Sequence, residues 1–179
     1  IIPRGGKGLI KKVSEESKIP VIKHLDGNCH VYIDKEADFK TAISCTINSK
    51  TQRYGVCNAA ESLLIHKSFP KSYIKEILHI LEGHKVEIRG CSQIKKLHPK
   101  IKSAKESDWY EEYLKPIISV KIVESIDDAV LHIEKYGSKH TEAIISKSKN
   151  AQDKFLREID SSSVMVNTST RFADGFEYG

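Results

Sequence analysis

The stretch TQRYGVCNAAE at residues 51–61, followed by SLLIH at 62–66, decides how the rest of the chain is arranged. It places Cys57 in a polar turn between a predicted helix and a predicted buried strand. Rigid elements on both sides hold such a turn in one place, and a nearby cation such as Arg53 favours the thiolate form of the cysteine. Cys57 is therefore either a catalytic nucleophile or a small buried side chain, and both interpretations stay open on these residues alone.

Strand patterns and helix patterns alternate on both sides of this turn. Asp38 is a typical helix cap, and the apolar spacing behind it predicts a helix to Thr51. Residues 91–111 are polar and Lys-rich, which predicts a short helix and a surface loop. The other predicted helices cover 70–81, 126–136 and 151–159, and the predicted strands cover 19–22, 29–33, 62–66, 85–89, 117–123, 143–145 and 163–167. This alternation indicates an α/β fold.

The composition is that of an ordinary globular protein, with 39% hydrophobic and 30% charged residues in 179. The net charge of +5 comes from 29 Lys and Arg mixed with 24 Asp and Glu. Basic residues do not alternate with aromatic ones as they do in RNA-binding sheets, so we predict no nucleic-acid partner. A cleft for an anionic substrate and cofactor explains the mild basicity equally well.

Four cysteines, at positions 29, 45, 57 and 91, are scattered without close pairing. This spacing predicts reduced thiols in a cytoplasmic protein. Cys29 and His30 are neighbours on a predicted strand and so point to opposite faces, which argues against a metal site. The sequence contains no apolar run of about 20 residues, so we predict no membrane partner. Because the chain begins with Ile1 and not with methionine, we expect it to be a piece of a longer protein.

Six blocks of the sequence, in order, resemble the gamma-glutamyl phosphate reductase (glutamate-5-semialdehyde dehydrogenase) family, a branch of the aldehyde dehydrogenase superfamily. The block around Cys57 has the family pattern of Gln-Arg, a short spacer and Cys-Asn-Ala-x-Glu. The other five blocks are IIPRGGKGLI at 1–10, CHVYID at 29–34, EYLKPI at 112–117, HIEKYGSKHT at 132–141 and NTSTRFADG at 167–175. The resemblance covers essentially the whole chain.

This resemblance implies an α/β fold with an aldehyde dehydrogenase-like catalytic domain, in which helices flank a mixed, mostly parallel sheet. Remnants of the cofactor-binding domain accompany it. The implied domains are 1–24, the end of the nucleotide-binding domain; 25–166, the catalytic domain; and 167–179, a return segment with the substrate loop.

The implied activity is the NADPH-dependent reduction of L-glutamyl 5-phosphate to L-glutamate 5-semialdehyde and phosphate in proline biosynthesis. Cys57 is the implied nucleophile and forms a thioester, while the Cys57 or Asn58 backbone N–H is a candidate to hold the oxyanion. NADP is the expected cofactor. We expect the intact protein to be a homo-oligomer, either partnered with or fused to a glutamate 5-kinase, and the piece alone to be inactive.

The resemblance also implies two binding regions. Glu112 corresponds to the glutamate that binds the nicotinamide ribose in the superfamily, and Leu114 replaces the aromatic residue that packs near the nicotinamide. The segment 167–175 is the expected substrate loop. There Arg171 offers a two-pronged donor for the substrate's α-carboxylate, and the remaining predicted substrate-binding residues are Asn167, Ser169 and Thr170.

One segment departs from the superfamily. Hydrolytic aldehyde dehydrogenases use a glutamate in a Glu-Leu-Gly-Gly segment to activate water, whereas this chain has His24-Leu25-Asp26-Gly27. Loss of that glutamate suits an enzyme that keeps its thioester for reduction. Two alternatives stay open: a non-catalytic oligomerisation or regulatory module of the same superfamily, and an aldehyde dehydrogenase with another substrate.

Overall fold

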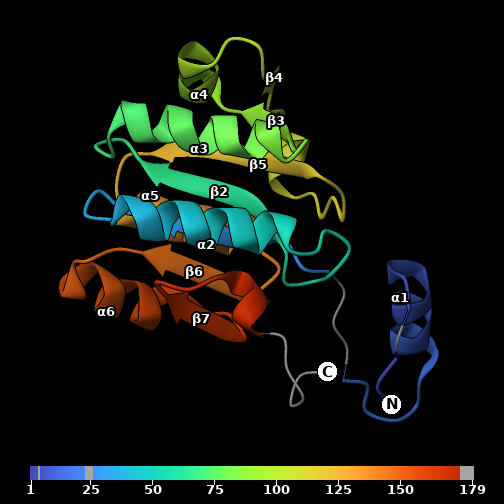
Figure 1. Ribbon diagram of the computed structural model, residues 1–179. Coiled ribbons are helices and arrows are strands. Elements are labelled where there is room, and N and C mark those ends of the chain that lie inside the picture. The colour runs from blue at the N-terminus through green and yellow to red at the C-terminus, as the bar shows by residue number, and fades with distance from the viewer. Residues whose placement is uncertain (4, 23–25, 174–179) are drawn as a thin grey trace.

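The computed structural model of the protein describes residues 1–3, 5–22 and 26–173. Its strands are β1 (Cys29–Ile33), β2 (Ala60–His66), β3 (Glu87–Gly90), β4 (Lys102–Ser103), β5 (Ile117–Val123), β6 (Thr141–Ile145) and β7 (Ser163–Val166). Its helices are α1 (Lys7–Glu16), α2 (Phe39–Thr51), α3 (Lys71–Gly83), α4 (Ser92–Leu97), α5 (Ile126–Tyr136) and α6 (Lys149–Glu158), with short 3-10 helices η1 (Glu106–Trp109) and η2 (Thr170–Ala173). The predicted α/β class is confirmed (Figure 1).

The seven strands form one sheet in the order β4-β3-β5-β2-β1-β6-β7. Every strand pair among the described residues is parallel, so that part of the chain has no antiparallel pair of the kind a mixed sheet contains. A parallel sheet puts the amino ends of all its strands at one edge and the carboxyl ends at the other. The segments before β1 and before β2 therefore meet at the amino edge.

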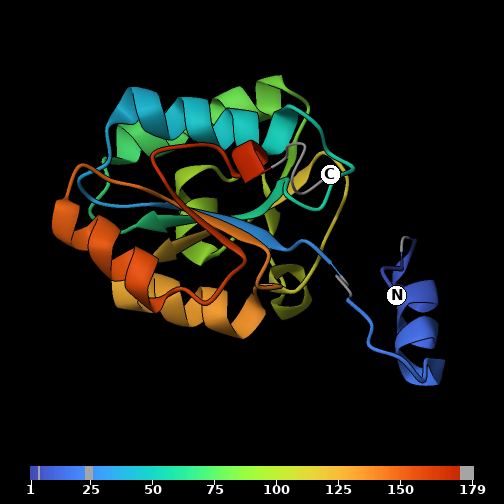
Figure 2. The same cartoon turned by 90° about the horizontal axis from the view of Figure 1, so that it is seen from below.

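Helices cover both faces of the sheet: α2 and α3 lie on one face and α5 and α6 on the other (Figures 1 and 2). Successive strand residues alternate between the faces. In β1, Val31 and Ile33 pack with α2 and α3, whereas Tyr32 packs with α5 and α6. Both cores need apolar residues, which explains why the central strands are buried along their whole length.

Helix starts follow the capping residues in the sequence. The Asp38 carboxylate accepts a hydrogen bond from the Thr41 backbone N–H (3.1 Å) at the start of α2. The Ser125 hydroxyl accepts one from the Asp128 N–H (3.2 Å) at the start of α5. Each bond satisfies a backbone donor that the helix itself leaves unpaired, so these two boundaries lie where the sequence predicts them.

The predicted strand at 19–22 is wrong, because this segment does not join the sheet. Ile22 N–H instead donates to the Ile1 carbonyl (2.9 Å), and the amino terminus of Ile1 donates to the Pro20 carbonyl (2.8 Å). Residues 1–3 and 5–22, with α1, stand beside the amino edge and apart from the sheet (Figures 1 and 2). The domain boundary predicted at residue 24 stays a prediction.

Several sequence predictions fall on residues 4, 23–25 and 174–179, which lie outside the described residues. These include the role of His24 and the end of the predicted substrate loop. Among the helices that the structure describes, none is both long enough and apolar enough to cross a bilayer.

Candidate active site

The turn that carries Cys57 joins the end of α2 to the start of β2 and lies at the amino edge of the sheet. A buried ion pair closes the base of this turn: Lys50 Nζ, from the last turn of α2, lies 2.5 Å from Glu61 Oε2 in β2. Both side chains are fully buried. Burial raises the pKa of Glu61 to about 7 and lowers the pKa of Lys50, while the opposite charge of each partner acts against both shifts. The pair therefore fixes the two ends of the turn relative to each other.

Within this turn, Cys57 and the residues around it differ in exposure. Cys57 is exposed, as is Arg53, whereas Asn58 is buried. Among the described residues, the Asn58 side-chain Oδ1 has no hydrogen-bond partner. The turn thus presents a thiol to the surface above a buried amide. A sulfur that solvent reaches can act as a nucleophile, which a sealed core cysteine cannot do.

Gly27 lies directly against the backbone of Cys57. A Cβ atom at position 27 would fall 1.7 Å from the Cys57 carbonyl oxygen, so only glycine fits this contact. The Gly27 N–H donates a hydrogen bond to Glu112 Oε1 (2.7 Å). Gly27 therefore joins Cys57 on one side to Glu112 on the other, and it brings two of the predicted site residues together.

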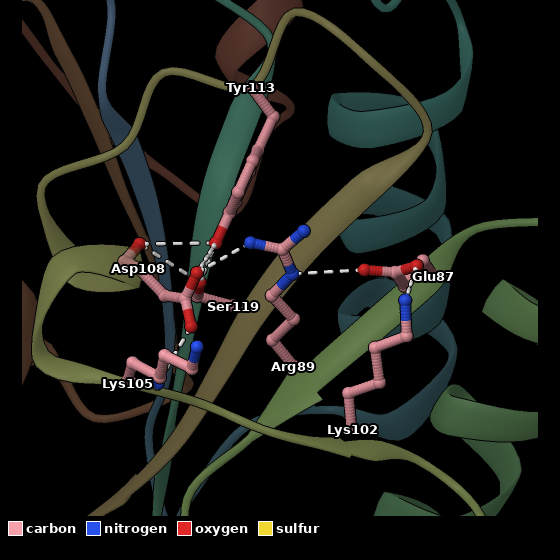
Figure 3. A network of polar contacts seen from close by, with 7 residues as sticks. All are labelled: Glu87, Arg89, Lys102, Lys105, Asp108, Tyr113 and Ser119. Carbon is pink, nitrogen blue, oxygen red and sulfur yellow. Dashed lines mark hydrogen bonds and ion pairs between the residues drawn. The ribbon is translucent and has the colours of Figure 1, made fainter.

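Glu112 and Leu114 belong to a segment that a polar network holds on the sheet (Figure 3). Asp108 is its centre: its carboxylate accepts hydrogen bonds from Arg89 Nη1 (2.6 Å), the Lys105 N–H (2.7 Å) and the Tyr113 hydroxyl (3.2 Å). The Tyr113 hydroxyl also lies 2.8 Å from Ser119 Oγ. Burial favours the neutral carboxyl, but the Lys105 N–H and the Arg89 guanidinium outweigh it and lower the pKa of Asp108. Asp108 therefore stays ionised and keeps the network intact.

The predicted surface loop at 91–111 thus contains buried anchors that sequence reasoning missed, namely Asp108 and Trp109. Arg89 could have indicated such an anchor, because an arginine within a predicted strand needs a carboxylate partner close by. Just beyond this loop, the Leu114 N–H donates to Glu61 Oε1 (3.1 Å). Glu61 therefore touches both Lys50 and the Glu112–Leu114 segment.

The return segment 167–173 lies along α2. Ser49 bridges the two: its hydroxyl donates to Ser169 Oγ (3.1 Å) and accepts from the Thr170 N–H (3.0 Å). Arg171 Nε donates to Gln52 Oε1 (2.8 Å). A hollow of about 410 Å³ opens here, lined by Asn48, Gln52, Thr168, Ser169, Arg171 and Phe172.

Two predicted substrate residues are not among those that line the hollow. Thr170 is fully buried. Asn167 follows β7 at the carboxyl edge, where its side chain accepts from the Ser146 N–H (2.9 Å) and donates to the Ser146 carbonyl (3.0 Å). With a φ of 54°, Asn167 also makes the sharp turn that sends the chain back along α2. Ser169 and Arg171 lie together at the hollow, whereas Thr170 and Asn167 support the segment from within the fold.

A metal centre was not predicted from the sequence. Across residues 1–3, 5–22 and 26–173, no three or more His, Cys, Asp or Glu side chains gather as a group that could hold a metal ion.

Several solved structures of known proteins are similar to this chain. No family model matches the chain. Gamma-glutamyl phosphate reductase from Thermotoga maritima is 45% identical, with a TM-score of 0.96, over 99% of this chain and 43% of that chain. Gamma-glutamyl phosphate reductase from Saccharomyces cerevisiae is 34% identical, with a TM-score of 0.64, over 97% of this chain and 44% of that chain.

An engineered glycolyl-CoA reductase with bound NADP⁺ shares the fold, with a TM-score of 0.73 and 17% identity over 98% of this chain and 48% of that chain. The chain spans less than half the length of each of these three proteins. By sequence and by fold it is related along its whole length to the gamma-glutamyl phosphate reductases and shares their aldehyde dehydrogenase-like α/β architecture.

Proposed function

We propose that this chain carries the nucleophile of a glutamate-5-semialdehyde dehydrogenase. That enzyme reduces L-glutamyl 5-phosphate with NADPH, yielding L-glutamate 5-semialdehyde and phosphate for proline biosynthesis. One observation carries the proposal: the exposed Cys57 packs against Gly27, whose N–H holds Glu112. A nucleophile and a cofactor-binding carboxylate are thereby held on two sides of one glycine. The 45% identity to the Thermotoga maritima reductase supports the same assignment.

Cys57 forms the covalent bond to the substrate. Its thiolate attacks the acyl carbon of glutamyl phosphate, the bond from that carbon to the phosphate oxygen breaks, and inorganic phosphate leaves. Bound NADPH supplies the hydride that reduces the resulting thioester. The carbon–sulfur bond then breaks, which releases the aldehyde and restores the thiolate. The backbone N–H of Cys57 or Asn58 stabilises the negative oxygen that develops on the acyl carbon.

Glu112 and Leu114 suit one end of a nicotinamide cofactor. Glu112 is half-buried and held by Gly27, so its carboxylate can accept hydrogen bonds from ribose hydroxyls without a large loss of side-chain entropy. Leu114 is 43% exposed and offers an apolar surface to a flat ring. The rest of the cofactor site belongs to the part of the relatives that this chain does not cover.

Arg171 and Ser169 form the substrate side. A guanidinium binds a carboxylate through two parallel hydrogen bonds, which suits the α-carboxylate of glutamyl phosphate. The bond from Arg171 Nε to Gln52 limits the orientations of that guanidinium before substrate arrives. The Ser169 hydroxyl lies in the same hollow. Thr170 and Asn167 hold the backbone of the return segment in place, and they thereby position Ser169 and Arg171 for the substrate.

A chimera tests the proposed function. The matching portion of the Thermotoga maritima reductase is replaced by this chain, whose backbone superposes on it with a TM-score of 0.96. The chimera is expected to oxidise L-glutamate 5-semialdehyde with NADP⁺ only when inorganic phosphate is present. Changing Cys57→Ala should lower this rate by at least about 10³-fold, because the covalent step is lost. Cys91→Ala, which removes another partly exposed thiol, is the matched control.

Two results would refute the proposal. Equal rates for the Cys57→Ala chimera and its parent would show that the thiol takes no part in the reaction. Oxidation that does not need phosphate would point to an aldehyde dehydrogenase of another kind. The non-catalytic alternative predicts that iodoacetamide alkylates Cys57 no faster than Cys29, Cys45 or Cys91, and a peptide-mass measurement on the chain itself decides this.

A further inference from the structure

A second thiol lies beside the candidate nucleophile. Cys29, the first residue of β1, directs its S–H to the carbonyl oxygen of Cys57, with 3.2 Å between sulfur and oxygen. A carbonyl oxygen lies about 2.4 Å from the Cα of its own residue, so the Cys29 sulfur is within about 5.6 Å of the Cys57 Cα. A disulfide between them requires the Cys57 side chain to rotate toward Cys29 and its exposed turn to move by a small amount.

The two thiols differ in their surroundings. Cys57 is exposed, whereas Cys29 is fully buried. Burial, followed by the Glu142 carboxylate, raises the pKa of the Cys29 thiol well above its usual value. At neutral pH, Cys29 is therefore a protonated thiol that small oxidants in solvent do not reach, while Cys57 is open to them.

A base lies next to the buried thiol. His140 Nδ1 is 3.8 Å from the Cys29 sulfur and 2.7 Å from Thr141 Oγ1. A neutral imidazole whose Nδ1 carries no proton can accept one from Cys29. The other two cysteines have other surroundings: Cys45 is buried in α2, and the Cys91 S–H donates to Gln93 Oε1 (3.2 Å).

We propose that Cys29 and Cys57 form a modification site in which a peroxide oxidises Cys57 and Cys29 then closes a disulfide with it. In the first step, the Cys57 thiolate attacks the peroxide, the O–O bond breaks, and Cys57 sulfenic acid and an alcohol or water form. In the second step, Cys29 gives its proton to His140 and attacks the Cys57 sulfur. The S–O bond breaks, and the leaving hydroxide takes up that proton as water.

The site protects the nucleophile. A sulfenic acid that stays exposed is oxidised further to sulfinic and sulfonic acids, which thiols do not reduce. A disulfide to Cys29 removes the sulfenic acid, and thiol exchange restores Cys57. This inference goes beyond the proposed activity, because it needs only an accessible Cys57 and a neighbouring thiol. The result of its test therefore does not depend on which substrate the enzyme uses.

The test uses the reduced 179-residue chain and hydrogen peroxide, followed by alkylation, digestion without reductant and mass spectrometry. The expected product is a peptide pair that joins Cys29 to Cys57, with two hydrogens lost and fully regained on treatment with dithiothreitol. In Cys29→Ser, dimedone should trap the Cys57 sulfenic acid, and sulfinic acid should then accumulate at Cys57. The matched controls Cys45→Ser and Cys91→Ser should still form the pair. His140→Gln should slow its formation on the order of 10- to 100-fold.

The wild-type chain alone decides between the outcomes even if a variant fails to fold. Sulfinic acid accumulating at Cys57 without any Cys29–Cys57 peptide would overturn the proposal, as would a disulfide between two chains through Cys57. Cys29→Ala provides a second test of the buried thiol, with circular dichroism as the check on folding. Because the readout is mass, an inactive chimera would leave this result unaffected.

Discussion

Two regions of the candidate site are built differently. The nucleophile region, defined here as residues 26–29, 50–61 and 105–114, is braced by the buried Lys50–Glu61 ion pair and by the network around Asp108. The return segment, residues 167–173, rests on α2 through the hydroxyl and amide contacts of Ser49 and Gln52. Phe172 at its end is 77% exposed.

This difference separates two tasks. A covalent step needs the sulfur and the hydride donor in a fixed relation, and buried charges hold such a relation because moving either charge out of its pair is costly. A substrate pocket must admit and release a ligand, which suits a half-exposed segment held by neutral hydrogen bonds. If the two regions differ in this way, substitutions in the nucleophile region should destabilise the fold more than substitutions in the return segment.

The first prediction concerns the ion pair. Lys50→Met leaves Glu61 buried without its cation, so we expect a loss of about 3–5 kcal/mol in the free energy of unfolding. Urea denaturation of the chain measures this loss. Lys40→Met, on the exposed side of the same helix, should change the free energy by less than about 0.5 kcal/mol.

The double variant Lys50→Met/Glu61→Gln sharpens this prediction. It removes both charges and keeps an acceptor for the Leu114 N–H, so it should recover most of the loss. A Lys50→Met chain as stable as the wild type would show that the pair does not brace the turn.

The second prediction concerns pH. Burial, together with the charges of His30, Lys121 and Lys135, lowers the pKa of His132 to about 2, far below its ordinary 6.5. The folded chain keeps this ring neutral while the unfolded chain protonates it below pH 6.5, so stability is full above that pH and falls as the pH drops. The loss reaches about 1.4 kcal/mol per pH unit, or about 3 kcal/mol at about pH 4.

His132 packs against Trp109, so acid should loosen the nucleophile region first. The measurement is urea denaturation from about pH 7 down to about pH 4. In His132→Gln, the free energy of unfolding should fall by about 3 kcal/mol less between about pH 7 and about pH 4 than it does in the wild type. His79→Gln, at an exposed position of α3, should lose as much as the wild type. Identical slopes for His132→Gln and wild type would contradict this prediction.

The third prediction tests the contact between Gly27 and the Cys57 backbone. Gly27→Ala puts a methyl group into the Cys57 carbonyl, so we expect a loss of about 1–3 kcal/mol and a changed alkylation rate at Cys57. Gly55→Ala lies in the same turn as Cys57 but meets nothing within 4 Å, and it should change neither quantity appreciably. If both variants had the same free energy of unfolding and the same alkylation rate at Cys57, the turn would be able to move away from the added methyl group without loss of stability.

The fourth prediction involves the smallest change in the free energy of unfolding. Arg171→Ala removes a half-exposed side chain, so the free energy of unfolding should change by less than about 0.5 kcal/mol. In the chimera the same change should raise the KM for L-glutamate 5-semialdehyde at least about 10-fold, because a charge-assisted contact is lost. Arg157→Ala on α6 is the control. An unchanged KM would remove Arg171 from the substrate site.

Much of the fold could be predicted because its signals are local. Asp38 and Ser125 mark helix starts through short-range hydrogen bonds, and strands such as 117–123 consist mostly of apolar residues. The strand predicted at 19–22 is apolar too, yet it has no neighbouring strand. Local sequence does not carry that information, because pairing depends on which segments meet in space.

The sequence allowed the kind of site to be predicted, but it did not allow the contacts between its residues to be predicted. Cys57 and Glu112 were identified from a family resemblance, but no pattern in the sequence indicated that Gly27 lies between them. The Asp108 network was missed because its partners come from β3, β5 and a loop, and each is an ordinary polar residue by itself. Asn167 was predicted to bind substrate because its loop follows a strand, and that role stays a prediction; the contacts of its side chain with Ser146, in the β6–α6 turn, were not foreseen.

The order of strands in the sheet also constrains how the chain is made. β5 lies between β2 and β3, so β3 and β4, which pair with each other, cannot join the rest of the sheet until residues 117–123 have been synthesised. Until then, β2 presents an open hydrogen-bonding edge to other nascent chains. A chain released before residue 117 would therefore be prone to aggregate through β2, and β5 covers that edge once it is complete.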